Sequence, residues 1–168
     1  MAIIRANNNT ISAVTALPSA ISTGSNIIEV ISSICDGRSI TVPSGTYTMP
    51  SVTSAQSMTT TWTDLTGSTF AYTPPSGTTK VIYKLLCAHG RSDDNPLSHV
   101  KFFVDSDEAT AYGRTIRGNN IVTLEDLTYI IDCNADTADT ATAKLTSWTT
   151  SKTIKIQARE YSGTYESA

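Results

Sequence analysis

The sequence predicts an all-β fold: an antiparallel β-sandwich or jelly roll preceded by an extended N-terminal arm. Threonine and serine are abundant, with 28 and 20 of 168 residues, and β-branched threonine suits a pleated, half-solvated surface. From residue 56 onward, short runs of alternating apolar side chains follow one another with turn signals between them. No stretch carries a convincing helical stripe. Six or seven strands at this spacing indicate a sandwich or jelly roll.

Composition excludes several classes of protein. The length suffices for one domain with a core plus an appendage. The 12 Lys and Arg are scattered and the net charge is −3, so no nucleic-acid partner is expected. No apolar run is long enough to cross a bilayer, so no membrane contact is expected. The start, MAIIRANNNT, lacks the apolar region and cleavage site of a secretory signal, which predicts synthesis in a cytoplasm.

The first 26 residues, here called the arm, differ from an ordinary disordered tail. They carry one charge, Arg5, which is too little for a typical disordered segment. They are also too few to bury their own apolar residues, and Pro18 argues against a helix. We therefore expect the arm to lie on another subunit, with a frayed terminus as the alternative. Its interface residues would be Ile3, Ile4, Ile11, Val14, Leu17 and Ile21.

Residues 27–55 read as a short β segment and linker. IIEVISSI at 27–34 is a predicted strand, Asp36-Gly37 a turn, and SITV at 39–42 a returning strand. A second turn at 43–45 precedes the extended piece TYTM. Residues 1–55 hold only 4 of the 27 charged side chains. This shift predicts three parts: the arm at 1–26, the β segment at 27–55 and the sandwich at 56–168.

The stretch Gly67–His89 predicts a strand, a proline turn at 74–77 and a second strand, which together form one two-faced β ribbon. In the second strand one face carries Val81, Tyr83, Leu85 and Cys87, and the other carries Ile82, Lys84 and Leu86, because strand side chains alternate. We expect the first face to be buried and the second to be half-buried, as in a sandwich that also packs on neighbours. Further strands are predicted at 58–65, 99–105, 112–116, 120–133, 143–148 and 152–161, with a turn at 106–108.

Cysteine and histidine offer a weak metal-site candidate. Cys35, Cys87 and Cys133 are odd in number and lack paired spacing, so free thiols are expected instead of a disulfide framework. Cys87 and His89 share a strand face, and His99 follows on the next strand. A structural zinc site usually has four ligands in two close pairs, and only one pair is present. We expect satisfied or solvent-facing histidines, with no metal and no cofactor.

Carboxylates and aromatic residues offer further candidate sites. Loop acids near 93, 107 and 136 could hold calcium only if they met at one end of the sandwich, and solvated acids are the simpler interpretation. Glu125 or Asp126 could form a glycosidase pair with Glu160, but nothing fixes their separation and no catalytic motif is present. The sequence therefore predicts no enzyme. Candidates for a sugar-stacking platform, with the core as the alternative, are Trp62, Tyr112, Trp148, Tyr161 and Tyr165.

Four stretches together resemble a group of viral proteins: IIEVISS at 27–33, TWTDLTGSTFAYTPPSGTTKVIYKL at 61–85, HVKFFVD at 99–105 and WTTSKTIKIQAREYSG at 148–163. They are similar to the jelly-roll minor structural proteins of tailed phages and large algal DNA viruses, whose architecture is like that of C1q and tumour-necrosis-factor modules. The resemblance covers about residues 27–165 and includes no catalytic motif. The family pattern continues with another strand after AREY, which is missing here, so a neighbouring subunit, or the N-terminal strands, would supply it, or the chain is a fragment.

The resemblance implies a homotrimer in the virion, as a minor capsid, capsid-decoration, fibre or tail component. Assembly would proceed through the arm, which would dock on other capsid or tail subunits, and through self-association of the sandwich. The alternative is a recognition module of a fibre or tail that binds a host surface glycan through loops 90–98 and 134–142.

Overall fold

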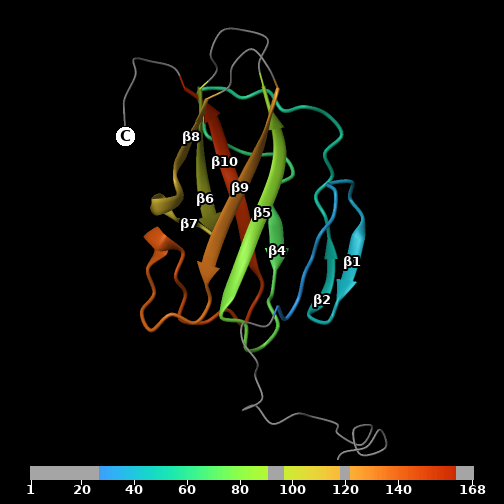
Figure 1. Ribbon diagram of the computed structural model, residues 1–168, viewed down its shortest axis with the longest axis vertical. Helices are drawn as coiled ribbons and strands as arrows, with labels where there is room; N and C mark the ends of the chain where they lie inside the picture. The colour runs from blue at the N-terminus through green and yellow to red at the C-terminus, as the bar shows by residue number, and fades with distance from the viewer. Residues whose placement is uncertain (1–26, 91–96, 118–121, 162–168) are drawn as a thin grey trace, which may run out of the picture.

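The computed structural model describes residues 27–90, 97–117 and 122–161 and shows an all-β protein of antiparallel strands, as predicted (Figure 1). The strands are β1 (Ser39–Val42), β2 (Gly45–Thr48), β3 (Thr63–Asp64), β4 (Phe70–Tyr72), β5 (Lys80–His89), β6 (Leu97–Val104), β7 (Asp107–Glu108), β8 (Arg114–Arg117), β9 (Thr123–Asp132) and β10 (Lys152–Glu160). The larger sheet has the order β3-β10-β6-β7, with β4 paired to β10 and β8 to β6. The pair β5-β9 crosses in front of it, and the hairpin β1-β2 stands beside them.

The core lies between the larger sheet and the β5-β9 pair. Alternate residues of β6, β9 and β10 point into it, as the period of two requires. At its centre the rings of Phe102 and Tyr129 stack with centroids 4.1 Å apart, and both side chains are fully buried. The largest fully buried side chains around them are Leu127, Ile131, Ile154 and Ile156. Both layers therefore contribute to one continuous core.

The strands on either side of the proline turn do not pair with each other. β4 pairs with β10 in the larger sheet, whereas β5 pairs with β9, so residues 73–79 carry the chain from one layer to the other. The prediction of one ribbon over Gly67–His89 was wrong in this respect. Proline lacks the N–H that a continuous ladder needs, which suits Pro74 and Pro75 to a crossing between sheets. The hydroxyl of Tyr83 links the layers by donating to the Ser68 carbonyl at 2.6 Å.

The two faces of β5 are as predicted, but the outer one is more exposed than expected. Val81, Tyr83, Leu85 and Cys87 face the core and are partly buried. On the other face Ile82 is 66% exposed and Leu86 is 56% exposed. The expected half-burial of this second face is not provided by any described part of the chain.

A buried side chain completes the ladder beside β10. β3 and β4 both pair with β10, but the residues between them leave the sheet. Ser68 fills the gap: its Oγ accepts from the Ile156 amide at 3.0 Å and donates to the Ile156 carbonyl at 3.1 Å. Gly67 makes the bend at φ 89°, a conformation that favours glycine, and a Cβ there would lie 2.7 Å from Val52 Cγ2. The predicted strand 58–65 is therefore only Thr63–Asp64.

The β segment before the sandwich differs from its prediction. Residues 27–34 have no strand partner in the described chain, and β1 pairs with β2 instead of with them. These residues are held by a carboxylate: Glu29 accepts from Ser44 Oγ at 2.6 Å, from the Ser44 amide at 2.9 Å and from Tyr72 Oη at 2.9 Å. Tyr47 of β2 packs on Phe70 and Tyr72, with centroids 5.7 and 5.3 Å away. The segment is thus docked on the sandwich.

Two predicted strands and one predicted turn also differ from their predictions. Residues 143–148 form no strand. They follow the 3-10 turn η3 (Thr140–Thr142), and Ala143 has φ 53°, which ends extended pairing. The strand expected at 112–116 begins at Arg114 instead, because Tyr112 lies in the turn η2 (Thr110–Tyr112). The turn expected at 106–108 is a tight hairpin in which β7 pairs back on β6.

Candidate interaction surface

The outward side of the β5-β9 pair, here called the β5/β9 outer face, is the most exposed apolar area on the sheets. It comprises Ile82, Lys84, Leu86 and Ala88 of β5 and Leu124, Asp126, Thr128 and Ile130 of β9. The four large aliphatic side chains, at 82, 86, 124 and 130, are between 47% and 67% exposed. Ile82 pairs with Ile130 at one end and Ala88 with Leu124 at the other.

An ion pair neutralises the middle of this face. Lys84 Nζ lies 2.6 Å from a carboxylate oxygen of Asp126, and the two charges cancel between the apolar ends. Hydrogen bonds from Lys84 and Thr128 lower the pKa of Asp126, so it stays ionised at neutral pH. Single exposed aliphatic residues are ordinary, but several on one sheet face indicate a contact surface. A partner could cover this face without burying a net charge.

The outer backbone edges of β9 and β5 differ in what binds their carbonyl groups. On the free side of β9, Tyr112 Oη donates to the Ile130 carbonyl at 2.7 Å and Arg114 donates to the Thr128 carbonyl at 3.2 Å. These side chains occupy carbonyls that a further strand would otherwise bind. Within the described residues, the ladder of β5 runs only to β9. The layer is therefore two strands wide in the described chain.

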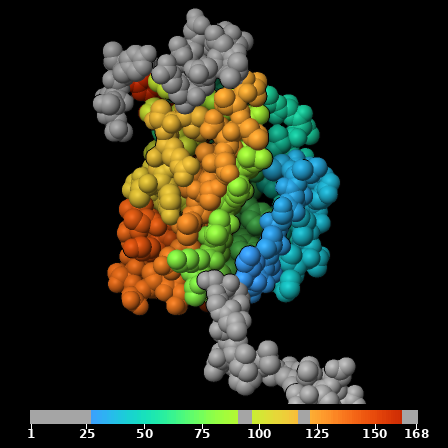
Figure 2. Space-filling model, viewed as in Figure 1, coloured from blue at the N-terminus to red at the C-terminus, as the bar shows by residue number. Residues whose placement is uncertain are grey.

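Residues 27–34 add further exposed apolar side chains on this side of the molecule. Ile27, Ile28, Val30 and Ile34 are between 51% and 82% exposed, while Ile31 packs against the core. Figure 2 shows this blue segment on the same side of the molecule as the green strand β5 and the orange strand β9. These exposed aliphatic side chains and those of the β5/β9 outer face thus belong to the same side of the molecule.

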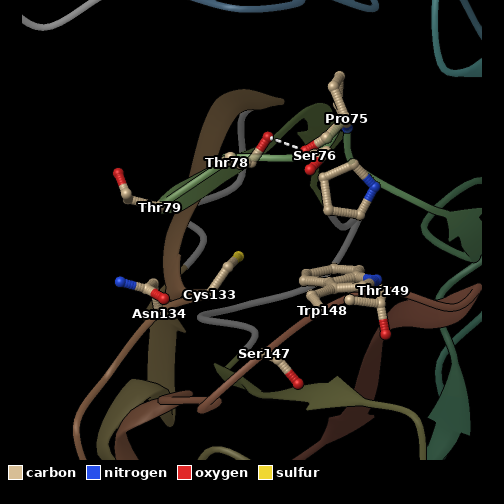
Figure 3. Close-up of a pocket in the computed structure, with 11 residues that line it drawn as sticks. Pro75, Ser76, Thr78, Thr79, Cys133, Asn134, Ser147, Trp148 and Thr149 are labelled. Carbon is tan, nitrogen blue, oxygen red and sulfur yellow. Dashed lines mark hydrogen bonds between the residues drawn. The ribbon is translucent and has the colours of Figure 1, made fainter. Parts of the chain in front are cut away.

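A separate cavity lies under the proline turn. It has a volume of about 340 Å³, at the lower end of the range for small-molecule sites. Figure 3 shows Pro75 and Thr78 of the turn on one side and Trp148, Cys133 and Asn134 on the other. Trp148 is only 5% exposed, and its indole N–H donates to the Tyr72 carbonyl at 3.2 Å. Most of the indole therefore belongs to the core, and only a small part of it borders the cavity.

Cys87, His89 and His99 do not come together as ligands. His89 faces the core, where its Nε2 lies 2.8 Å from Ser98 Oγ, and both side chains are buried. His99 lies on the opposite side of β6, with its ring 5.0 Å from that of Tyr161. Burial and the nearby Arg159 lower the pKa of His99, which favours the neutral ring. In residues 27–90, 97–117 and 122–161 no three metal-binding side chains cluster.

The His89–Ser98 pair was not foreseen from the sequence. Nucleophilic catalysis can use a serine and a histidine at this distance, but the serine must reach a substrate. Ser98 is 3% exposed and His89 is 7% exposed. The spacing of a serine and a histidine on two different strands gives no signal in the sequence, because it depends on how the strands are arranged.

Two of the carboxylates considered as calcium ligands, Asp105 and Asp139, bind other groups. Asp105 pairs with Lys152 at 2.8 Å, and Asp139 accepts from the Ala141 amide at 3.1 Å as the cap of η3. Glu125 and Asp126 are adjacent on β9 and therefore point to opposite faces. Asp93 and Asp94 lie outside the described residues, as do the arm residues predicted to form an interface.

The aromatic candidates do not form one platform. Trp62 contacts two cations, with Lys101 Nζ and Arg159 Cζ each 4.7 Å from a ring centroid. Tyr112 packs edge-on against Tyr129, with centroids 5.5 Å apart. Trp148 is in the core, which was the alternative interpretation for it. Tyr165 lies outside the described residues. The cation contacts of Trp62 could not be foreseen, because they depend on the register of β10 against β6.

Comparisons of the chain with protein-family models, with curated proteins and with solved structures find no match. No helix in the described part of the chain is both long and apolar enough to span a membrane. The functional interpretation therefore depends on the geometry of the surfaces themselves.

Proposed function

We propose that this chain is a structural component of a virus particle, a minor capsid, capsid-decoration or fibre protein whose role is assembly. It acts through its N-terminal arm and through self-association of the sandwich, as a homotrimer that also contacts other capsid or tail subunits. It is made in the host cytoplasm and ends in the virion. The viral setting is supported by the resemblance of four sequence stretches to minor structural proteins.

One observation carries the assembly role. The β5/β9 outer face presents four large aliphatic side chains that are 47–67% exposed, arranged around a neutral ion pair. Burial of apolar area favours association at about 25 cal/mol per Å², before the costs of lost freedom. A protein that worked alone would gain nothing from leaving this face open to water. Burial of these aliphatic side chains against another protein segment would instead stabilise an assembly.

The test is incorporation into particles. Deleting residues 1–26 should remove the protein from purified virions and leave the sandwich folded, because the buried core residues of the described chain lie between Tyr72 and Ala158. A full-length variant with the six aliphatic arm residues changed to serine keeps the length of the arm and tests whether its apolar side chains are what incorporation requires. Normal incorporation of both variants would refute the assembly role of the arm.

The cavity at Trp148 favours a second candidate, recognition of a host glycan. Its wall combines the edge of an indole with the amide of Asn134 and the hydroxyl of Thr78, groups that suit a sugar. Binding to a glycan array should then disappear in Asn134→Ala, with Asp136→Ala as a control in the same loop. A blank array across host polysaccharides would count against this candidate.

A further inference from the structure

We propose that residues 1–26 of this chain bind the β5/β9 outer face. The inference concerns the same arm as the proposed function, but it asks which surface the arm covers. The function requires in addition that the covered surface belongs to another copy. The two statements can therefore fail separately.

The arm and the β5/β9 outer face are both apolar and carry almost no net charge. The arm carries six large aliphatic residues, one charge at Arg5 and too little chain to form a core of its own. The face has four aliphatic side chains at 47–67% exposure and no described segment over it. Its only charges, Lys84 and Asp126, already neutralise each other at 2.6 Å. An almost uncharged apolar segment can therefore cover the face without leaving an unpaired charge, which would be costly to bury.

The arm joins the described chain next to this face. Figures 1 and 2 show the first described residues beside the lower end of β5, the end at which that strand begins. Lys80 is its first residue, so the apolar pair Ile82–Ile130 lies near this end. Ile27 and Ile28, the first two described residues, are 82% and 51% exposed. The arm is thus attached where the apolar surface starts.

The arm is also long enough. The face follows a strand of ten residues, which is about 33 Å long at 3.3 Å per residue. An extended segment of 26 residues reaches roughly 86 Å, so it can cross the face of its own copy or that of a neighbour. Ile11 and Leu17 are six residues apart, as are Leu124 and Ile130. Both spacings correspond to about 20 Å in extended chain, so the aliphatic positions can align.

The content of the arm suits an extended segment. TISAVTAL at 10–17 is rich in β-branched residues, and Ile11, Ala13 and Leu17 share one side of an extended chain. Such a segment can lay one side on the face of a sheet. A helix is less compatible with it, because Pro18 follows and Ser and Thr are frequent.

The test captures whatever lies on the face of the full-length protein. Leu86 is replaced by the photo-crosslinking residue p-benzoylphenylalanine, and the cross-linked peptides are identified by mass spectrometry. The matched control carries the same residue in place of Ala71, which is exposed on β4 in the other layer. We expect cross-links from position 86 to residues 1–26 and none from position 71. Cross-links from 86 to β5 or β9 of a second copy, no cross-link at all, or equal capture from 71 would overturn the inference.

Mixing isotope-labelled and unlabelled chains separates this inference from the proposed function. A cross-link between a labelled and an unlabelled chain supports both. A cross-link within one chain supports the inference but contradicts the role of the arm in joining copies.

A second measurement uses proteolysis of the full-length chain. Leu86→Lys keeps the fold, because the new lysine lies opposite Asp126 in the register. Removing one buried leucine contact should increase cleavage within residues 1–26 about tenfold, the factor that corresponds to 1.4 kcal/mol. Ala71→Lys should leave cleavage unchanged. Equal cleavage of the arm in all three proteins would refute the inference.

Discussion

Replacing Ser68 with alanine should weaken the larger sheet more than its small size suggests. The Ser68 side chain is fully buried, and its Oγ is the partner of the Ile156 amide at 3.0 Å. Ile156 lies on the central strand β10, where its other neighbour, Phe102 of β6, is also fully buried. No water can replace the lost partner without disturbing the core. The change therefore leaves a buried N–H unsatisfied.

Such a group costs about 1–3 kcal/mol, so we expect a loss of about 2 kcal/mol in the free energy of unfolding. For a chain of this size that corresponds to a fall in Tm of about 4–8 °C. Urea unfolding followed by circular dichroism measures it as a lower midpoint at unchanged slope. Thr69→Ala, at the exposed neighbouring position, is the control. A loss for Ser68→Ala no larger than that of the control would refute the assignment of Ser68 as the missing ladder partner.

Three further predictions concern other parts of the fold. Leu85→Lys should unfold the protein, whereas Leu86→Lys should leave it folded and lower the free energy of unfolding by no more than the roughly 1.4 kcal/mol of its contact with the arm, because the two side chains lie on opposite faces of β5; equal effects in urea unfolding would contradict this. Burial raises the pKa of Glu29, but hydrogen bonds from Ser44 and Tyr72 outweigh it and lower the pKa below 4.5, so these contacts stabilise the fold above that pH and are lost as pH falls through the lowered pKa. The free energy of unfolding of the wild type should therefore exceed that of Glu29→Gln by about 1 kcal/mol at pH 7, and the difference should shrink below pH 4. Equal stability of the two proteins at pH 7 would contradict this. Cys133 is buried and its pKa is raised to about 11, so iodoacetamide at pH 8 should modify this thiol only after unfolding. Rapid labelling of Cys133 itself in the native protein, located by peptide mass spectrometry, would contradict its burial.

The alternation of apolar and polar residues predicted the local features of the strands, such as which side chains share a face. The two faces of β5 were correct because side chains at i and i+2 share a side whatever the strand pairs with. The pairing partners were not predictable in this way. Pro74-Pro75-Ser76-Gly77 would look the same in a hairpin and in a crossing between layers, and the partner of β5 lies more than 30 residues further on.

The remaining differences have the same cause. IIEVISSI alternates like a strand, but it docks through Glu29 on Ser44 and Tyr72 and has no ladder within the described residues. Ser68 is one of 20 serines, and only the gap between β3 and β4 gives it a role. For the candidate surface, the sequence identified Ile82 and Leu86 as a second apolar face, but their exposure depends on how many strands cover that layer.

The mass of the full-length chain in solution tests the claim of assembly most directly. Sedimentation equilibrium of the purified protein should give three times the 17.9 kDa of one chain. In Leu86→Lys, loss of the contact between the β5/β9 outer face and the arm of another copy should shift the population toward single chains, while Ala71→Lys should leave it unchanged. A wild-type mass of one chain across the concentration range would contradict self-association through this sandwich.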